Sequence, residues 1–336
     1  MGGNSEERDV SLASGAQVAR ALREAGHEVV AVDTTRGALS PDEERALLDS
    51  GVRAEAPDPD ALDLLDTGDT TALTRDPRVE ETDVVFVALH GGAGEDGTIQ
   101  ALLDLAGMPY AGSGRIGCTL AMDKDLSKRL FRDGGIPTPD WIAGETDPTS
   151  VVEELGLPLI VKPAAGGSTL GLTLVRSAEE IPAAVAEARR YGEPVMYERF
   201  VEGRELTVGV LGDEALPVGE IIPAHEIFDY ECKYQPGMAE EIFPAKISGA
   251  LAAELRKLAL RAHRLLRLRD FSRIDFIVDE EGRPWCLEAN ALPGMTATSL
   301  LPQAARATGI SFPDLCDRIA RLALERIRAV GQGASD

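Results

Sequence analysis

A chain of 336 residues is too long for one small core, so its length predicts two or three domains. The net charge of −23 argues against nucleic acid and anionic membranes as partners, and no apolar run reaches the length of a membrane span. Four scattered cysteines without a CxxC pair, and a polar N-terminus unlike a signal peptide, predict a cytoplasmic protein with free thiols.

The N-terminal residues predict the start of an open α/β sheet. Residues 2–11 form a glycine-led polar turn that runs into a helix, with Asp9 or Ser11 as its cap, and a strand follows over residues 27–32. A glycine-rich turn at a helix N-terminus can hold an anion. Residues 40–80 are rich in Asp, Pro and Thr, and we expect an irregular surface insertion with short helical pieces there.

The continuous apolar run of residues 83–89 predicts a buried strand. It ends at His90 and several glycines, and a helix is expected over residues 98–107. The end of a strand before a helix is where an open α/β sheet places ligands, so His90 is a candidate binding residue. A histidine that only caps or hydrogen-bonds within the loop is the alternative.

Two lysines occupy positions suited to an anionic ligand. Lys124 lies in a helical stretch over residues 121–134, and Lys162 ends a strand over residues 157–163. The small residues of the next segment, 164–171, form a loop that can lie against a polyphosphate. No GK[ST] follows, so this is not a Walker A loop, and an ordinary hairpin loop with a solvated lysine is the alternative.

The following segment predicts strands, a lid and a long helix. Strands are expected over residues 194–201 and 205–212. Residues 228–245 show little periodicity and are a candidate mobile lid. Residues 247–268 predict a long helix in which His263 is a surface or packing residue rather than a ligand.

Residues 271–296 predict a β-hairpin followed by a loop, with two terminal helices beyond. If the hairpin is regular, residues whose numbers add to 563 lie opposite each other. Asp275 then faces Glu288 and Arg273 faces Asn290, all on one side of the sheet. The apolar residues alternate to the other side: Ile274, Phe276, Val278, Trp285, Leu287 and Ala289.

The opposed carboxylates of Asp275 and Glu288 point to a cation. Two acids at this separation, with Cβ atoms about 5 Å apart, repel each other and weaken the strand pairing. Oxygen ligands from Asp, Glu and Asn suit Mg²⁺, which keeps further positions for water and phosphate. The alternative is a solvated polar face on an amphipathic hairpin, and a β-bulge would change the register. The spacing leaves both interpretations open.

Six motifs stand in the sequence in this order: HGGAGEDGTIQ, MDKDLSK, LIVKPAAGGSTLG, FDYECKY, SRIDF and LEANALPGMTATSLLP. Together they closely resemble those of the D-alanine–D-alanine ligases, a family with the ATP-grasp fold, and the likeness runs from Gly2 to the C-terminal helices. The resemblance implies an α/β protein with an N-terminal Rossmann-like domain, residues 1–120, and a two-lobed ATP-grasp fold, residues 121–210 and 211–336.

The resemblance also implies a reaction. ATP phosphorylates the carboxylate of a first D-alanine, and the amine of a second attacks the acyl phosphate to give D-alanyl-D-alanine for peptidoglycan precursors. The implied partners are small molecules, D-alanine and ATP, with two Mg²⁺ (or Mn²⁺) ions as further cofactors. Asp275, Glu288 and Asn290 match the ligands of these metal ions. The oligomeric state is left open, with a homodimer as the candidate.

The remaining site residues are assigned by the resemblance alone. Around ATP it places Lys124 and Lys162 at the phosphates, Ser168 and Thr169 in the loop over them, Glu198, Arg199 and Val201 at the adenine, and Glu205 at the ribose. Around the amino acids it places Glu7 at the ammonium group of the first D-alanine, His90 beside it, Arg273 and the Gly294 backbone at the developing oxyanion, and Ser299 at the second substrate's carboxylate. In the lid it places Lys233 and Tyr234, with Tyr234 reaching towards Ser168 and Glu7 on closure. Excluding water is necessary because an acyl phosphate hydrolyses.

Two other functions remain open at this point. One is a related ATP-grasp ligase with another acceptor, such as D-lactate or a different amino acid, although the pair Lys233–Tyr234 goes with an amine acceptor in this family. The other is a nucleotide-binding relative without catalysis. In the family a hydrophobic strand leads into the first glycines, so we expect the upstream sequence to encode in frame about five to eight apolar residues, with Met1 not the natural start.

Overall fold

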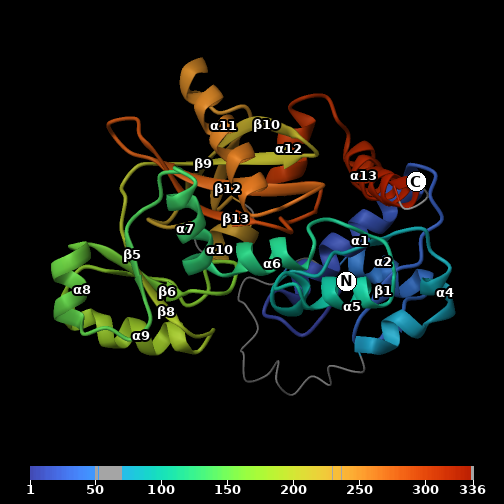
Figure 1. The fold of residues 1–336 in the computed structure, drawn as a ribbon, viewed down its shortest axis with the longest axis horizontal. Helices are drawn as coiled ribbons and strands as arrows, with labels where there is room; N and C mark the ends of the chain where they lie inside the picture. Colours follow the sequence, from blue (N-terminus) through green and yellow to red (C-terminus); the bar gives the residue numbers. More distant parts are fainter. Residues whose placement is uncertain (50–51, 53–69, 229, 236, 334–336) are drawn as a thin grey trace.

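The computed structural model describes residues 1–49, 52, 70–228, 230–235 and 237–333. Three groups of elements follow one another along the chain (Figure 1). A helical N-terminal part with short strands lies on one side, a four-stranded sheet lies on the other, and a five-stranded sheet lies between and above them. No helix in these ranges is both long and apolar enough to cross a bilayer.

The N-terminal part is mainly helical. Its helix α1 begins at Arg8 with Glu7 as the N-cap, so the predicted caps Asp9 and Ser11 are wrong. Asp9 lies instead in the first turn, where a carboxylate complements the helix dipole. The elements are α1 (Arg8–Glu24), β1 (Val32–Asp33), β2 (Gly37–Ala38), α2 (Pro41–Asp49), η1 (Thr70–Arg75), α4 (Pro77–Glu80), β3 (Val85–Phe86), η2 (Gly92–Gly94), α5 (Thr98–Leu105), β4 (Tyr110–Ala111) and α6 (Arg115–Met122).

The two strands predicted in this part are much shorter than expected. Of the first segment, residues 27–32, only Val32 lies in a strand, β1, which pairs with β2. Of the second, only Val85–Phe86 is a strand, and it pairs in parallel with β4. Around the second strand, serine side chains of the N-terminal segment donate to backbone carbonyls that a longer strand would pair with a neighbouring strand. The Ser11 hydroxyl donates to the carbonyl of Ala88 at 2.7 Å and the Ser5 hydroxyl to that of His90 at 2.5 Å. The predicted burial of this run therefore holds for Val87, Ala88 and Leu89, while Val85 and Phe86 are only half-buried and the predicted strand length is wrong.

The middle part is an antiparallel sheet in the order β5-β8-β6-β7. The predicted helical stretch over residues 121–134 is divided at Asp123, which has an extended backbone and accepts from the Leu126 N–H to cap the second helix. The elements are α7 (Lys124–Asp133), β5 (Trp141–Ala143), α8 (Pro148–Leu155), β6 (Leu159–Pro163), β7 (Thr173–Val175), η3 (Ala178–Glu180), α9 (Ile181–Arg189) and β8 (Val195–Arg199).

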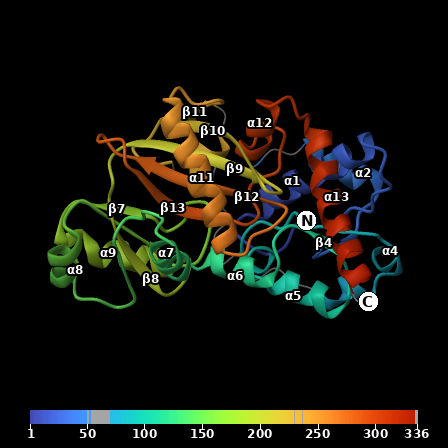
Figure 2. The same cartoon turned by 45° about the horizontal axis from the view of Figure 1, so that its top comes forward.

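The C-terminal part is an antiparallel sheet in the order β11-β10-β9-β12-β13, with α11 packed on it (Figure 2). The segment predicted as an aperiodic lid contains a short helix and a strand, β11, that pairs with β10. Both terminal helices are present, as predicted. The elements are β9 (Arg204–Leu211), β10 (Glu214–Pro223), α10 (Tyr230–Tyr234), β11 (Ala239–Ile242), α11 (Gly249–Leu265), β12 (Phe271–Val278), β13 (Pro284–Asn290), α12 (Leu300–Arg306) and α13 (Phe312–Gly333).

The hairpin β12–β13 has two registers. In the half next to the cavity described below, Arg273 pairs with Asn290 and Asp275 with Glu288, which confirms the predicted pairing. A β-bulge follows, and Phe276 then pairs with Cys286 instead of Leu287. A bulge adds one residue to one strand and reverses the alternation beyond it. The rule that paired residue numbers add to 563 therefore holds on the cavity side of the bulge and fails on the turn side.

Two large apolar clusters hold these parts together. One joins α1, β3 and β4 to α12 and α13, so the last helix of the chain packs against the first (Figure 2). The other fills the space between the five-stranded sheet and α11, and includes Phe131 of α7. Each fully buried large apolar side chain contributes about 1.5–3 kcal/mol. The three-domain division stays a prediction, with the two larger sheets using residues 141–199 and 204–290.

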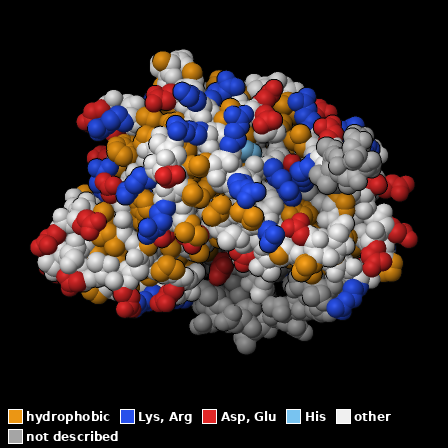
Figure 3. Space-filling view, in the orientation of Figure 1, with side chains coloured by type: hydrophobic (Ala, Val, Ile, Leu, Met, Phe, Trp, Pro, Cys, Tyr) orange, Lys and Arg blue, Asp and Glu red, His pale blue; other side chains and the backbone are white. Residues whose placement is uncertain are grey.

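The surface charge is uneven. On the face in Figure 3, Lys and Arg side chains gather over the upper half around α11, while Asp and Glu side chains lie mostly along the rim. Against a net charge of −23, local positive charge is informative about anionic ligands. Local positive charge also occurs inside the molecule, where Lys124 and Lys162 line one cavity.

Candidate active site

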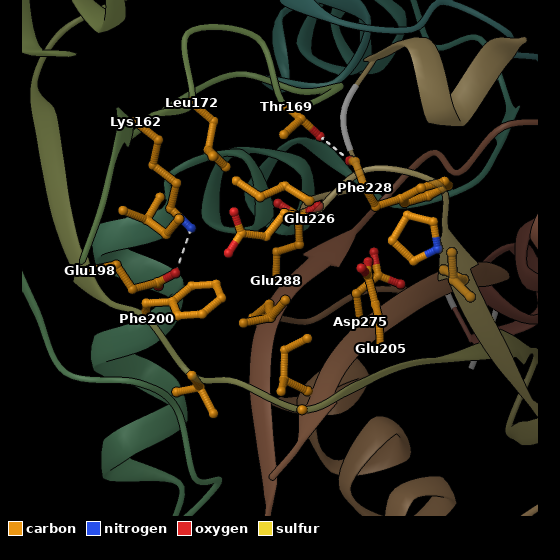
Figure 4. Close-up of a pocket in the computed structure, with 18 of the residues that line it drawn as sticks. Lys162, Thr169, Leu172, Glu198, Phe200, Glu205, Glu226, Phe228, Asp275 and Glu288 are labelled. Carbon is orange, nitrogen blue, oxygen red and sulfur yellow. Dashed lines mark hydrogen bonds and ion pairs between the residues drawn. The ribbon is translucent and has the colours of Figure 1, made fainter. Parts of the chain in front are cut away.

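A cavity of about 810 Å³ lies between the four-stranded and five-stranded sheets. Side chains from both sheets and from the segment before α10 point into it (Figure 4). Eleven of the predicted site residues line this cavity: Lys124, Lys162, Thr169, Glu198, Arg199, Val201, Glu205, Lys233, Arg273, Asp275 and Glu288. Residues predicted from distant segments are thus brought to one place.

At one end of the cavity Glu198 of β8 is buried between two lysines. Its carboxylate lies 2.8 Å from Lys162 Nζ and 2.5 Å from Lys128 Nζ. Burial alone would raise the pKa of Glu198, but the two ammonium groups together hold this pKa below its usual value. Burial lowers the pKa of Lys128, against the effect of Glu198. Arg199, next along β8, lies with its guanidinium 4.9 Å from the centre of the Trp285 ring.

Lys124 joins the small-residue loop to the β12–β13 hairpin. Its ammonium group donates to the carbonyl of Gly166 at 2.6 Å and lies 3.3 Å from Glu288. In the loop itself, Ser168 and Thr169 have φ values of 53° and 63°. This left-handed conformation is costly for residues other than glycine, and costliest for a β-branched one. Such strain persists only where surrounding contacts hold the backbone.

Contacts of the loop bring all three parts of the chain together. The Ser168 hydroxyl donates to the Glu7 carboxylate at the start of α1, and the Thr169 hydroxyl donates to the carbonyl of Phe228 at 2.9 Å (Figure 4). The loop also passes close to Glu7, since a Cβ on Gly167 would lie 2.7 Å from its carboxylate. These bonds place the loop over the cavity and against the N-terminal part.

On the hairpin face, Asp275 is held by three neighbouring side chains. Its carboxylate accepts from the Thr207 hydroxyl at 2.7 Å, from the Arg273 guanidinium at 2.9 Å and from the Asn290 amide at 2.9 Å. Burial favours the neutral form of Glu288, but Lys124, Lys233 and Lys162 together lower its pKa to about 2. The hairpin therefore presents an ionised carboxylate to the cavity.

The neighbouring strand β9 adds a third acid, Glu205 (Figure 4). Burial, then repulsion by Asp275, raises the pKa of Glu205 to about 7. Burial lowers the pKa of Lys233, whose ammonium group lies 5.5 Å from the centre of the Phe228 ring. Leu287 also lines the cavity, because the bulge turns it to the same side as Glu288. Its predicted position on the opposite face is wrong for this reason.

The donor set fits a hard divalent cation. Asp275 and Glu288 face each other across the strand pair beside Asn290, and their negative charge also acts on Glu205. Carboxylate and amide oxygens are what Mg²⁺ takes, with phosphate oxygens and water completing its shell. In the part of the chain that the structure describes, no three His, Cys, Asp or Glu side chains form a cluster that could hold a metal ion by themselves. The protein would thus supply part of the ligand shell.

A second cluster surrounds His90, which is buried. Its Nε2 lies 3.0 Å from the Ser14 hydroxyl, and its Nδ1 lies 3.2 Å from the Leu292 carbonyl and 3.3 Å from the Glu95 carboxylate. The Ser14 hydroxyl also accepts from the Met295 N–H at 3.3 Å. Burial raises the pKa of Glu95. His90 therefore connects α1 and η2 with the loop after β13.

The loop after β13 holds the last predicted site residues. The Ser299 hydroxyl accepts from the Thr296 N–H at 3.1 Å, and a Cβ on Gly294 would lie 3.0 Å from that hydroxyl. Gly294, Ser299, Glu7, Ser168, His90 and Asn290 are not among the residues lining the cavity. The Tyr234 side chain lies outside what the structure describes, although its backbone belongs to α10.

Two residues of the site were not predicted from the sequence. Lys128 lies one helical turn after Lys124, and this spacing was the available signal. Thr207 lies two residues after Glu205 on β9, so strand alternation places both on one face. Their partners Glu198 and Asp275 come from distant segments, which a single pattern cannot reveal.

Comparisons with known proteins agree with this geometry. Residues 1–113 match the family model described as D-ala D-ala ligase N-terminus, and residues 130–321 match D-ala D-ala ligase C-terminus. The D-alanine–D-alanine ligase of Desulfotalea psychrophila is 50% identical over 73% of this chain and 79% of its own length. The D-alanine–D-alanine ligase of Geobacter sulfurreducens is 41% identical over 99% of this chain and 96% of its own length. The crystal structure of D-alanine–D-alanine ligase from Bacillus anthracis complexed with ATP matches with a TM-score of 0.77 at 29% identity, over 98% of this chain and 97% of that one.

Two sheets around a cavity lined by lysines and carboxylates define an α/β enzyme of the ATP-grasp class. Within that class, the chain belongs to the D-alanine–D-alanine ligase family.

Proposed function

We propose that this chain joins two D-alanine molecules in an ATP-dependent reaction. The carboxylate of the first D-alanine attacks the γ-phosphorus of ATP, which gives an acyl phosphate and ADP. The amine of the second attacks the acyl carbon, and phosphate leaves. The observation that carries the proposal is the loop of Ser168 and Thr169, which reaches both the cavity and Glu7 of the N-terminal part.

Roles in ATP binding follow from position in the cavity. Lys124 and Lys162 are the cations beside the glycine loop and suit the phosphates, because phosphoryl transfer depends on neutralising charge. Glu198, Arg199 and Val201 lie where β8 leads into β9, and we assign the adenine to them and the ribose to Glu205. Thr169 closes the loop over the phosphates.

Asp275, Glu288 and Asn290 would hold the Mg²⁺ (or Mn²⁺) ions of this reaction. A bound divalent cation supplies positive charge that offsets the charge building up on the transferred phosphoryl group. Arg273, now bonded to Asp275 at 2.9 Å, is on the same face and suits the oxyanion that develops at the acyl carbon. The backbone N–H of Gly294 is proposed to act with it.

The amino-acid substrates are assigned to residues next to the cavity, at the start of α1, at His90 and in the loop after β13. Glu7, buried and ionisable, suits the ammonium group of the first D-alanine, with His90 beside it. Ser299 at the start of α12 suits the carboxylate of the second. Lys233 lies above the cavity, and we assign Tyr234, whose side chain is outside the described part, to the same lid. We propose that the reaction takes place in the cytoplasm, where ATP is supplied, and that its product is the dipeptide for peptidoglycan precursors.

A ligase that uses D-lactate or another amino acid as acceptor is the nearest competing function. Measuring phosphate release from ATP with D-alanine, L-alanine and D-lactate offered separately, with product analysis, distinguishes them. We expect D-alanyl-D-alanine as the main product at pH 7, and more of it as pH rises, because the attacking amine must be neutral. Mainly ester at pH 7, or no nucleotide-dependent product at all, would contradict the proposal.

A further inference from the structure

The two lysines that contact Glu198 differ in their access to the cavity. Lys162 lines the cavity and keeps 10% of its side chain exposed. Lys128 is completely buried and is not among the lining residues. Both nevertheless carry short ion pairs to the same carboxylate, at 2.8 Å from Lys162 and 2.5 Å from Lys128. One cation of this triad can therefore meet a ligand and the other cannot.

Besides Glu198, the side chains of Thr138 and Trp141 lie against the Lys128 ammonium group. Its Nζ donates to the Thr138 hydroxyl at 2.7 Å, and that hydroxyl donates to the carbonyl of Cys286 on β13 at 2.8 Å. The ring of Trp141 lies with its centre 5.3 Å from the same Nζ. Helix α7 supports the other end of the side chain. These contacts tie Lys128 to Glu198 as a permanent partner.

The charges explain why a second lysine is needed. While Lys162 stays 2.8 Å from Glu198, that carboxylate balances much of its charge, so Lys162 attracts a polyphosphate less strongly. If Lys162 were the only partner, moving it would leave a buried carboxylate without a counter-ion, which is strongly unfavourable. With Lys128 in place, Glu198 stays paired when Lys162 turns to the ligand.

We propose that Lys128 is a positioning residue that neutralises Glu198 permanently and so releases Lys162 to the phosphates of ATP. The inference rests on the proposed function only in requiring that the chain binds ATP. It predicts that Lys128 contributes to the recognition of the phosphates, which it does not touch. Adenosine, which has no phosphates, would gain little from it.

The test is the affinity for ATP and for adenosine, measured by calorimetry on the full chain. In Lys128→Met the ratio of ATP affinity to adenosine affinity should fall roughly ten- to a hundredfold, the range of a lost charge-assisted contact. The ratio is used because an effect that acts through Glu198 on the adenine alters both affinities alike. Lys128→Gln keeps a hydrogen-bond donor without the charge and should show the same loss as Lys128→Met. It also replaces Lys128→Met in the test if that variant does not fold. Lys257→Met, at an exposed position on α11, is the matched control and should change neither affinity.

A rescue separates this role from a merely structural one. In Lys128→Met/Glu198→Gln no carboxylate retains Lys162, so the ratio of ATP to adenosine affinity should return to that of Glu198→Gln alone. Equal losses for ATP and adenosine, an unchanged ATP affinity in both Lys128 variants, or no rescue would overturn the inference. If the unmodified chain binds adenosine and ATP equally, the phosphates of ATP are not recognised and the proposed function itself fails. In the three outcomes above the unmodified chain still prefers ATP and only the inference fails, so the two failures are distinguishable.

Discussion

Asp275 and Glu288 lie directly opposite each other on β12 and β13, yet different cations balance them. Asp275 is bonded to Arg273 at 2.9 Å, and Glu288 lies 3.3 Å from Lys124. Each of these basic residues also faces the cavity. The repulsion expected between the two acids is thus offset by groups that we assign to the reacting phosphates and the oxyanion.

Glu288→Gln should abolish metal-dependent turnover and leave the fold intact. Removing one carboxylate weakens the proposed cation site, and we expect kcat/KM to fall about a hundredfold or more, as when other charge-stabilising groups are lost. The melting temperature should change little, because the substitution also relieves repulsion by Asp275. Glu280→Gln, exposed at the hairpin turn, is the control. Near-normal activity of Glu288→Gln at ordinary Mg²⁺ would rule out the site.

Thr169→Val should uncouple ATP consumption from ligation. Valine has nearly the same shape as threonine but cannot donate to the Phe228 carbonyl, so the loop is held less firmly over the cavity. Water then reaches the acyl phosphate more easily. The ratio of phosphate released to dipeptide formed should rise above one. Thr169→Ser keeps the hydroxyl and should stay near one; a ratio of one in both variants would contradict the role of this bond.

Leu287→Ala distinguishes the bulged hairpin from a regular one. Because Leu287 lines the cavity, its truncation should weaken ATP binding by roughly five- to thirtyfold, equivalent to about 1–2 kcal/mol, with little loss of stability. Ile274→Ala, at a fully buried position, should instead lower the free energy of unfolding by about 2–5 kcal/mol. Measuring nucleotide affinity and denaturant unfolding for both variants checks this. A large stability loss for Leu287→Ala with normal affinity would place Leu287 in the core.

His263 should make the protein less stable in acid. Burial lowers the pKa of this histidine from 6.5 to about 4, and its Nδ1 lies 2.7 Å from the Ser272 hydroxyl. Between these values the unfolded chain binds a proton here and the folded chain does not, so the free energy of unfolding decreases as pH falls from 6.5 towards 4. The full contribution is about 3 kcal/mol.

Denaturant unfolding of the protein and of His263→Gln across this pH range measures the effect. Other groups contribute equally to both proteins, so the difference between the two curves isolates His263. We expect the variant to show the weaker pH dependence. Parallel curves would contradict the buried neutral state of this histidine.

The sequence predicted the chemistry of the hairpin better than its shape. Strand alternation and a fixed sum of residue numbers were enough to pair Asp275 with Glu288, since the bulge lies beyond them. They were not enough to place Leu287, because a bulge depends on tertiary packing rather than on residue type. The same limit applies to residues 83–89, of which only the last three are buried, and where the Ala88 carbonyl accepts from the Ser11 hydroxyl rather than from a neighbouring strand.

Buried charge was the least predictable part of the site. Lysine is rarely fully buried, so the spacing of Lys128 from Lys124 was not enough to separate it from a surface helix residue. Its position depends on Glu198, which comes from another strand far along the chain. Lys124 and Lys162 were found because the family resemblance assigns them to the phosphates, and the structure shows that both line the cavity.

The bulge in β13 also affects how the hairpin can change during evolution. On the cavity side, β12 is fixed by its pairing with β9, where Asp275 lies opposite Thr207. On the turn side, beyond the bulge, the pairing has a separate register. Substitutions and small insertions at the exposed tip, around Gly282, can be absorbed there without moving the carboxylates. We therefore expect changes of length at the tip to leave the two carboxylates in place, whereas a change of length between Cys286 and Asn290 would shift Glu288 away from Asp275.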